Sequence, residues 1–228
     1  MRSLREIFRS YAVFNAEGKH VNGSDKQSNH AYGDAYDSLF VPYTYDDNLC
    51  TPVYEGGRMV TRSCKECASD TSHFVTCSKF KRPNTLTREN CKLMMEIGVA
   101  DGSSLCAWRE AFPNALVVGM DIHHSDRANG ERIEFYLGDQ RSKEDCERAA
   151  AGRQFDLIVE DATHQLTDTL VTLLYLWPFV KPGGMYIVEE FCNIGALKEH
   201  VKALWPCAEI VDTPSPFGGL EQLVVLRK

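Results

Sequence analysis

Hydrophobic positions along the second half of the chain fall into a regular alternation. From residue 92 onward, short apolar runs are separated by longer segments in which apolar residues recur at helical spacing. Short apolar runs are typical of buried strands, and a spacing of three to four residues is typical of helices. The pattern predicts strands at residues 93–99, 115–122, 133–137, 155–159, 185–188 and 207–211, with a final strand after the turn SPFGG.

The connections between these strands predict the fold class. Strand–helix–strand units place successive strands parallel in one sheet with helices on its faces. We therefore expect an α/β fold with a Rossmann-like, doubly wound sheet of seven strands, mostly parallel with an antiparallel last strand. The connecting helices are expected at residues 105–112, in the charged segment up to about 151, and at 167–179 and 197–204.

The first ninety or so residues differ in character from the rest. An early polar and aromatic segment is predicted to form a short helix, because its apolar residues recur at helical spacing. These residues are Tyr32, Tyr36, Leu39 and Phe40. The segment after it carries scattered Pro, Gly, Ser, Thr and Cys with little period of either kind, which predicts an irregular insert. We therefore expect three parts: an N-terminal helical lid segment (1–43), a cysteine-containing insert (44–91) and a catalytic domain (92–228).

Composition and charge exclude some partners. Acidic residues outnumber basic ones by 32 to 25, and a formal charge of −7 disfavours binding to long stretches of phosphate backbone, so no nucleic-acid partner is expected. The longest apolar run, residues 170–180, is interrupted by Thr172 and Pro178 and is too short for a membrane span. The start of the chain does not resemble a secretory signal, and nine cysteines, an odd number, then indicate reduced thiols and a cytoplasmic location.

A glycine-containing turn follows the first predicted strand. Glu96, Gly98, Ala100 and Gly102 lie in the sequence EIGVADG, at a strand-to-helix junction. Glycines there let the backbone turn tightly and approach a ligand, while the helix N-terminus offers free N–H groups. Asp121 ends the second strand about 20 residues later, where an acidic side chain can accept hydrogen bonds from ribose hydroxyls. This combination predicts a nucleotide-like cofactor.

The same motifs resemble those of the class I S-adenosylmethionine-dependent methyltransferases, over residues 93–228. The resemblance implies that Gly98, Gly102 and Ser103 cradle the methionine moiety and that Asp121 holds the ribose. A glycine of the family motif is replaced here by Ala100, which leaves less room beside the cofactor. A Rossmann-type turn for NAD, or for no ligand, is the alternative. Further cofactor-binding residues that the resemblance implies are Glu96, Ala100 and Ile122, and, near the adenine, Asp139 and Gln140.

Acidic residues follow two further predicted strands. Glu160, Asp161 and His164 lie in the sequence EDATH, and Glu189 and Glu190 lie in EEF. In doubly wound sheets ligands bind outside the carboxyl ends of the strands, so both groups are expected to face one crevice. Carboxylate oxygens suit a hard cation such as Mg²⁺ or Mn²⁺, which lowers the pKa of a bound hydroxyl, and a nearby imidazole can take the proton.

These acids narrow the resemblance to the Mg²⁺-dependent sugar O-methyltransferases of the macrolide and rhamnose type, which carry Asp-Asp-Gly-Ser-His and Glu-Asp at these places. The resemblance implies that Asp161, Glu189 and Glu190 ligate the metal, and that Asp161 and His164 are catalytic, His164 as the general base. Neighbouring strand residues point to opposite faces, so both glutamates can ligate only where the strand frays. The alternatives are solvated strand ends with a packing histidine, or part of a two-His-one-carboxylate iron site.

The stretch GSDKQSNHAY resembles the Gly-Thr-Asp-Lys segment that closes over the cofactor in the same family. The resemblance implies that His30 and Tyr32 face the site, with Tyr32 at the cofactor. A surface helix whose aromatic residues pack on the sheet edge is the alternative.

Cysteines in the insert have part of the spacing of a zinc knuckle. Two interpretations are open. One is a structural Zn²⁺ held by Cys50, Cys64, Cys67 and Cys77, with His73 as a further candidate ligand, and the other is ordinary reduced cysteines. The insert is otherwise expected to shape acceptor specificity or a subunit contact in a homo-oligomer.

Together these features predict an O-methyltransferase that moves the methyl group of S-adenosylmethionine to a sugar hydroxyl. A deoxyhexose such as rhamnose, in a glycan or a small-molecule glycoside, is the leading acceptor. Two alternatives remain open. One is a catechol-type O-methyltransferase that binds vicinal phenolic oxygens through the same cation, and the other is a non-catalytic, zinc-bearing binding module on the same fold.

Overall fold

The structure is a computed structural model, and it describes residues 1–14, 20–24, 26, 30, 32–40, 51–55, 58–62, 86–125, 127–189, 208–214 and 220–228. The chain divides into two compact units: Met1–Phe40 together with Leu86–Lys228, and Val41–Thr85. In the second unit, β3 (Thr51–Glu55) and β4 (Arg58–Arg62) pair as an antiparallel hairpin, where the sequence pattern predicted irregular structure. The two glycines between these strands in the sequence are typical of a two-residue hairpin turn.

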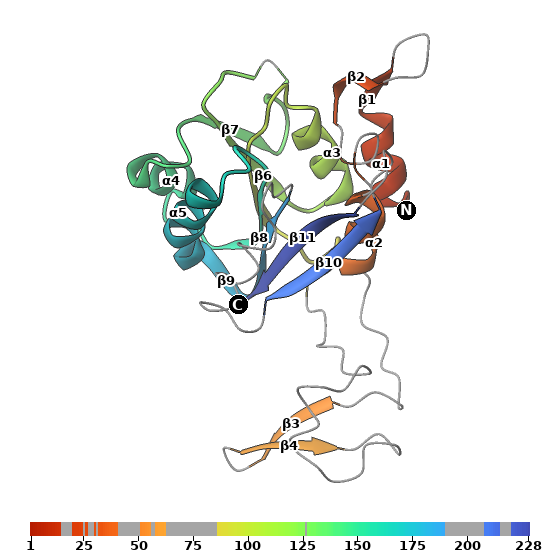
Figure 1. Ribbon diagram of the computed structural model, residues 1–228, viewed down its shortest axis with the longest axis vertical. Helices are drawn as coiled ribbons and strands as arrows, with labels where there is room; N and C mark the ends of the chain where they lie inside the picture. Colours follow the sequence, from red (N-terminus) through yellow and green to blue (C-terminus); the bar gives the residue numbers. More distant parts are fainter. Residues whose placement is uncertain are drawn as a thin grey trace. The chain divides into compact units, whose positions relative to one another are not determined.

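A seven-stranded sheet forms the centre of the first unit (Figure 1), with the strand order β10-β11-β9-β8-β5-β6-β7. Parallel pairing joins β9, β8, β5, β6 and β7, whereas β11 runs antiparallel to both of its neighbours. The predicted fold class is therefore confirmed. The strands are β5 (Leu93–Ile97), β6 (Leu116–Asp121), β7 (Ile133–Leu137), β8 (Phe155–Glu160), β9 (Val180–Val188), β10 (Glu209–Pro214) and β11 (Leu220–Arg227).

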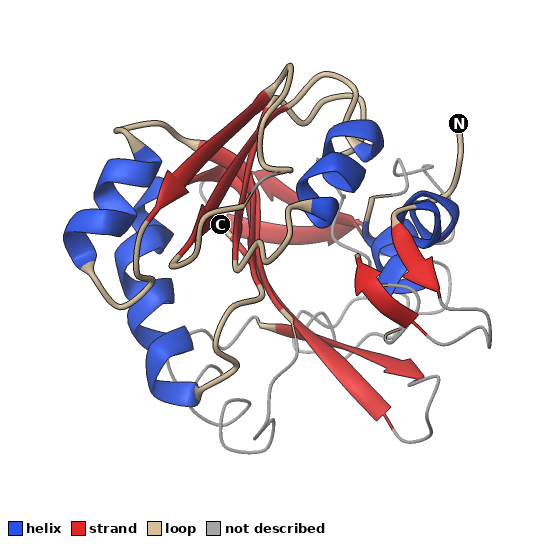
Figure 2. Ribbon diagram, turned by 90° about the horizontal axis from the view of Figure 1, so that it is seen from above, coloured by secondary structure: helices blue, strands red, loops and turns tan. Residues whose placement is uncertain are grey.

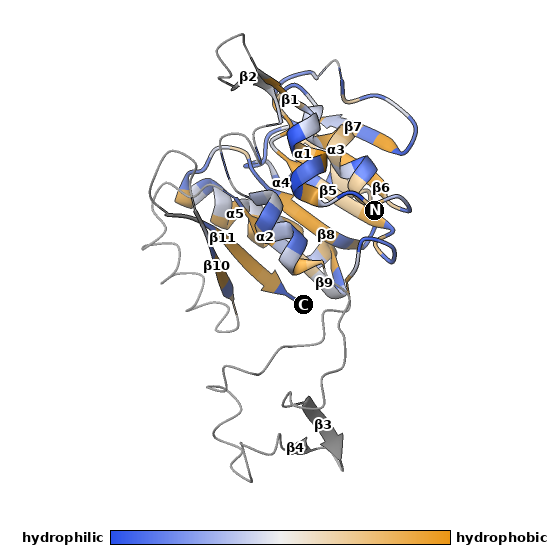
Figure 3. Cartoon of the chain, turned by 90° about the vertical axis from the view of Figure 1, so that its right-hand side faces the viewer, coloured by the Kyte–Doolittle hydropathy of each residue, from blue (hydrophilic) through white to orange (hydrophobic). Residues whose placement is uncertain are grey.

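The central strands are buried on both faces, which explains why they appear in the sequence as continuous apolar runs (Figure 3). All six residues of β8 are buried, and neighbouring residues of β5 enter opposite sides of the sheet. Met94 packs with the helices on one face, and Met95 packs with the helices on the other face. The described residues include no helix that is both long and apolar enough to cross a membrane.

Helices cover both faces of the sheet (Figure 2). One face carries α3 (Ser103–Ala111), α1 (Leu4–Ser10) and α2 (Tyr32–Leu39), whose buried side chains share one apolar cluster. The opposite face carries α4 (Lys143–Ala150) and α5 (Leu166–Leu176), and α5 is followed by a short 3₁₀ helix, η2 (Trp177–Phe179). The sheet is thus doubly wound, as the alternation of strands and helices predicted.

The N-terminal segment is docked against α3 through aromatic side chains. The rings of Phe8 and Tyr36 meet that of Trp108 edge to face, at centroid distances of 4.7 and 4.9 Å. A capping box of Ser3 and Glu6 begins α1, and the two strands β1 (Ala12–Phe14) and β2 (His20–Gly23) form a hairpin after it. The segment is therefore an integral part of the first unit.

Candidate active site

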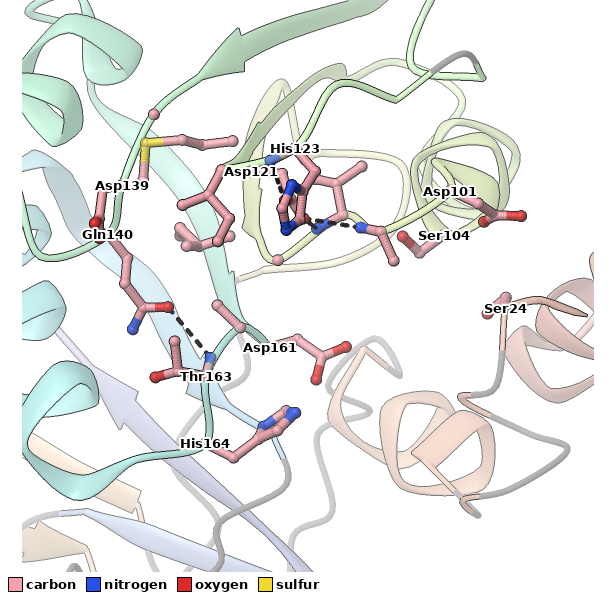
Figure 4. Close-up of a pocket in the computed structure, with 18 of the residues that line it drawn as sticks. Ser24, Asp101, Ser104, Asp121, His123, Asp139, Gln140, Asp161, Thr163 and His164 are labelled. Atoms are coloured by element: carbon pink, nitrogen blue, oxygen red, sulfur yellow. Dashed lines mark hydrogen bonds between the residues drawn. The ribbon is translucent and has the colours of Figure 1, made fainter.

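A cavity of about 410 Å³ opens at the carboxyl ends of the parallel strands (Figure 4), a volume in the range of small-molecule binding sites. Its walls come from the segments that follow β5, β6, β7 and β8, and from Gly23, Ser24 and Lys26 of the N-terminal segment. Of the sequence-predicted residues, those that line it are Gly98, Ala100, Asp121, Ile122, Asp139, Gln140, Asp161 and His164.

The turn after β5 needs glycine at two positions. Gly98 has a φ of +86°, and a Cβ there would lie 2.1 Å from the backbone oxygen of Asp161. Gly102 has a φ of +84°, and a Cβ there would lie 2.5 Å from Oγ of Ser125. Left-handed backbone and close approach together exclude a side chain at these positions. The turn therefore packs directly on the segment that carries the predicted catalytic residues.

Asp121 holds the same turn from the end of β6. Its Oδ2 accepts hydrogen bonds from the backbone N–H groups of Val99 and Ala100, at 2.7 and 2.9 Å, and its Oδ1 accepts one from that of His123, at 2.8 Å. A carboxylate offers roughly four acceptor positions, so about one remains for a ligand. Asp121 thus stabilises the turn through hydrogen bonds to its backbone. Its remaining acceptor position suffices for one ribose hydroxyl and not for two.

Gln140 follows β7, and its side-chain amide forms hydrogen bonds with other residues of the protein. Its Nε2 donates to Oγ1 of Thr172 at 3.1 Å and to Oε1 of Glu160 at 3.3 Å, while its Oε1 accepts from the N–H of Thr163 at 3.3 Å. These bonds tie the end of β7 to the segment after β8. Burial raises the pKa of Glu160 to about 7, so this carboxyl group is partly protonated at neutral pH.

Asp139 lies beside Gln140 at the exposed rim of the cavity. Its carboxylate is paired with the guanidinium of Arg141, whose Nη2 lies 2.6 Å from Oδ2. Hydrogen bonds from Arg141 lower the pKa of Asp139. An ionised, outward-facing acid at this place can contact a polar part of a ligand that enters between β6 and β7.

Four of the residues that the resemblance placed at the cofactor do not line the cavity: Glu96, Gly102, Ser103 and Tyr32. Ser103 is buried, and its hydroxyl bonds to Asp101 and to Arg127. The ring of Tyr32 is buried and stacks on His30, with centroids 5.0 Å apart. The neighbour of Ser103, Ser104, lines the cavity instead and donates to Oε2 of Glu96 at 2.6 Å.

A buried lysine joins the acids at the strand ends. The Nζ of Lys26 lies 2.6 Å from Oε2 of Glu189, 2.8 Å from Oδ2 of Asp161 and 3.2 Å from Oε1 of Glu96. We call Glu96, Asp161 and Glu189 the carboxylate cluster. Burial lowers the pKa of Lys26, but the three carboxylates outweigh it and raise that pKa well above its usual value. Lys26 is therefore a permanent cation among these acids.

Further partners of the cluster come from helices α2 and α3. The hydroxyl of Tyr36 donates to Oε1 of Glu189, and Nε1 of Trp108 donates to Oε1 of Glu96 at 2.9 Å. Burial raises the pKa of Glu189 well above its usual value and also raises that of Glu96, while Lys26 opposes both shifts. Burial thus favours the neutral forms of Glu189 and Glu96, whereas Lys26 favours their ionised forms.

Asp161 is the member of the cluster that faces the cavity. Its side chain is 19% exposed, and Figure 4 shows it next to His164. His164 has a φ of +56°, a backbone conformation that is uncommon outside glycine and is often found at functional sites. The predicted pair of an acid and an imidazole thus lines one wall.

The carboxylate cluster has donors of the type that a hard cation prefers. Asp161 and Glu189 follow different strands, and one oxygen of each lies within 2.8 Å of the Lys26 ammonium. Glu189 directly follows the end of β9, where the strand alternation no longer applies. Glu190 lies outside the described residues, and within these no group of three or more His, Cys, Asp or Glu side chains is arranged to hold a metal. Asp161 and Glu189 supply carboxylate oxygens, the donor type that the predicted cation prefers, and Asp161 also lines the cavity.

The proposed zinc ligands Cys50, Cys64, Cys67 and Cys77, and also His73, lie outside the described residues. Among the residues that the structure does describe, Cys91, Cys106 and Cys146 are free thiols.

Several lining residues had not been singled out in the sequence: Ser24, Lys26, Ser104, His123 and Arg141. The stretch GSDK was noted for its resemblance to a family segment, but nothing in the sequence indicates that the ammonium of Lys26 meets three acids from elsewhere in the chain.

Residues 95–191 match a family model described as a methyltransferase domain. A demethylmacrocin O-methyltransferase of Streptomyces fradiae is 32% identical over 106 residues, which are 42% of this chain and 27% of the relative. An 8-demethyl-8-alpha-L-rhamnosyl tetracenomycin-C 2'-O-methyltransferase of Streptomyces olivaceus is 28% identical over 148 residues, 60% of this chain and 37% of the relative. The chain thus spans roughly a quarter to two fifths of the length of these curated relatives.

A solved structure described as MycE methyltransferase from the mycinamycin biosynthetic pathway, in complex with Mg and SAH, is 24% identical with a TM-score of 0.49, and the match covers 62% of this chain and 46% of that one. The match to the family model and to named O-methyltransferases agrees with the resemblance seen in the motifs. Residues 95–191 therefore resemble a methyltransferase domain, in agreement with the motifs at the ends of the strands.

Proposed function

We propose that the chain transfers the methyl group of S-adenosylmethionine to a hydroxyl group of a sugar, with a divalent cation and His164 assisting. The observation that carries the proposal is the cavity itself. It brings the glycine turn after β5, Asp121 after β6, and the Asp161–His164 pair after β8 onto the walls of one site. The relative whose name gives a rhamnosyl tetracenomycin-C as its substrate supports a deoxyhexose such as rhamnose as the acceptor.

The glycine turn and Asp121 would hold the methyl donor. The close backbone at Gly98 leaves the turn flat against the segment after β8, so a ligand lying on the turn also lies beside Asp161. Asp121 would accept one ribose hydroxyl with its remaining acceptor position. Ile122, which is 53% exposed at the rim of the cavity, offers an apolar surface to an adenine ring. S-Adenosylmethionine supplies an electrophilic methyl group on its sulfonium.

Asp161, Glu189 and Glu190 would hold Mg²⁺ or Mn²⁺, which would make an acceptor hydroxyl more acidic and fix its position. His164 would take the proton from that hydroxyl on an imidazole nitrogen as the oxygen attacks the methyl carbon and the carbon–sulfur bond breaks, which releases S-adenosylhomocysteine. Asp161 and His164 lie together on one wall, so the acceptor oxygen is expected between that wall and the glycine turn. The turn and the N-terminal residues around Ser24 would limit the access of water.

A transfer assay tests the proposal. The full chain is incubated with donor carrying an isotopically labelled methyl group and a panel of rhamnosides, other glycosides and catechols, each with Mg²⁺ or with a chelator. Label on a glycoside hydroxyl that is lost with chelator supports the proposal. Label confined to catechols would favour the phenolic alternative, and absence of label from every acceptor would contradict methyl transfer to these classes.

A further inference from the structure

Lys26 and Tyr36 belong to the N-terminal segment, far from the methyltransferase domain in sequence, yet both contact Glu189. The two oxygens of this carboxylate are divided between them: Oε2 is bound by Nζ of Lys26, and Oε1 by the hydroxyl of Tyr36. Glu189 is 1% exposed, so these contacts replace its water shell. Its position is therefore set by the N-terminal segment.

The same ammonium reaches Asp161. An ammonium has three N–H donors, and the three carboxylates in reach of Lys26 stand at the ends of the adjacent strands β5, β8 and β9. Without a shared cation, buried carboxylates at this separation repel one another. Lys26 thus holds one oxygen of Asp161 and one oxygen of Glu189 beside its own ammonium.

Asp161 remains open on its other side. Only its Oδ2 is bound by Lys26, and the described residues place no hydrogen-bond donor on Oδ1. Because Asp161 lines the cavity, this oxygen is available to a ligand there. The contact with Lys26 therefore fixes the carboxylate of Asp161, while its Oδ1 remains able to bind a ligand in the cavity.

The backbone of Lys26 is fixed as well. Its carbonyl accepts hydrogen bonds from the N–H groups of Tyr32 and Gly33, at 2.9 and 3.4 Å, at the start of α2. Helix α2 is in turn docked by the edge-to-face contact between Tyr36 and Trp108 and by the bond from the N–H of Leu4 to Asp37, at 2.8 Å. The ammonium is thus anchored by packed structure.

We infer that Lys26 and Tyr36 are positioning residues that orient Asp161 and Glu189 for cation binding, so that the cation site is assembled from the N-terminal segment and the strand ends together. The inference rests on the proposed function, because it assigns a role toward the cation proposed there. Groups that orient metal ligands typically change metal affinity by about tenfold to a hundredfold when they are removed.

Binding of Mn²⁺ to the full chain, followed through the electron paramagnetic resonance signal of the free ion, tests the inference without any need for turnover. Lys26→Met is expected to weaken Mn²⁺ binding by about tenfold or more. Tyr36→Phe removes only a hydroxyl and keeps the ring on Trp108, so it should fold, and it is expected to weaken binding by about fivefold.

Matched controls are present in the chain. Lys181→Met breaks an ion pair with Asp156, 2.8 Å long, at the opposite end of β9, and Tyr186→Phe removes a buried hydroxyl that has no hydrogen-bond partner among the described residues. Both should bind Mn²⁺ as the unmodified chain does. A general loss of stability would weaken binding in the controls also, whereas a positioning role would not.

The sign of the effect separates positioning from competition. If the ammonium merely occupied the place of the cation, Lys26→Met would bind Mn²⁺ more tightly, and this result would overturn the inference, as would unchanged affinity. Should Lys26→Met fail to fold, Tyr36→Phe alone tests the inference. An unchanged affinity of Tyr36→Phe for Mn²⁺ would then overturn it. Absence of Mn²⁺ binding by the unmodified chain would instead remove the proposed cation, and the inference with it.

Discussion

Substituting Gly98 by alanine should separate the two walls of the site. The new Cβ would lie 2.1 Å from the backbone oxygen of Asp161, 2.5 Å from its carbonyl carbon and 2.6 Å from Cα of Ala162. All three are backbone atoms, so no side chain can swing away to relieve the contact. Ordinary packing begins near 3.4 Å, so the turn and the segment after β8 would have to move apart by about 1.3 Å.

Two costs should follow for Gly98→Ala. A non-glycine residue at a φ of +86° is strained by about 1–2 kcal/mol in free energy of unfolding, and the steric contact adds to this. A misplacement of about 1 Å between reacting groups can lower activity by about a hundredfold. We therefore expect a loss of about two orders of magnitude in kcat/KM, together with weaker binding of S-adenosylhomocysteine.

Gly152 supplies the matched control, because it has a φ of +69° but no heavy atom within 4 Å of an added Cβ. Gly152→Ala should show the backbone strain alone, with unchanged ligand affinity. Chemical denaturation measures the stability of both variants, and titration calorimetry with S-adenosylhomocysteine measures their affinity. If Gly98→Ala bound S-adenosylhomocysteine as tightly as Gly152→Ala, ligand binding would not depend on the close packing between the glycine turn and the segment after β8.

Three further changes test separate parts of the site. Glu160→Gln should remove a pH dependence: burial raises the pKa of Glu160 from 4.5 to about 7, so ionisation should lower the stability of the unmodified chain by about 3 kcal/mol as pH rises from about 4.5 through 7. The stability difference between variant and unmodified chain, from urea denaturation, should therefore grow in favour of the variant from pH 5 to pH 8, and a constant difference would be contrary to this. His164→Ala should lower kcat by about 10² to 10⁴-fold while leaving the affinity for S-adenosylhomocysteine unchanged, and full turnover would remove His164 as the base. Asp161→Asn should abolish the stimulation of methyl transfer by Mg²⁺, and undiminished stimulation would take Asp161 out of the cation site.

The sheet was predictable because its strands are buried on both faces. Residues 133–137 form β7 with the predicted bounds, and the other central strands lie within a few residues of prediction, except that β9 begins at Val180 rather than at 185. Lys181, Pro182 and Gly183 are exposed, and Pro and Gly are typical of turns, so the sequence KPGG predicted a break before the strand. Helix α1 was not predicted, although its capping box is visible in the sequence, because seven residues give little periodicity.

The candidate site was predictable where its residues follow strands directly. Gly98, Asp121 and Asp161 each stand at a strand end, and the parallel order of strands brings such positions together. Lys26 was not predictable, because its partners Asp161 and Glu189 lie 135 and 163 residues away in the sequence. The position of Tyr32, turned into the apolar cluster and not toward the cavity, likewise depends on how the N-terminal segment docks.

Calorimetric titration of S-adenosylhomocysteine into the full chain, with NAD titrated in parallel, tests the identity of the cavity most directly. The match of residues 95–191 to a methyltransferase domain predicts saturable heat with one ligand per chain for S-adenosylhomocysteine and none for NAD. Absence of heat with S-adenosylhomocysteine, or its displacement by NAD, would contradict the assignment of this cavity to the methyl donor.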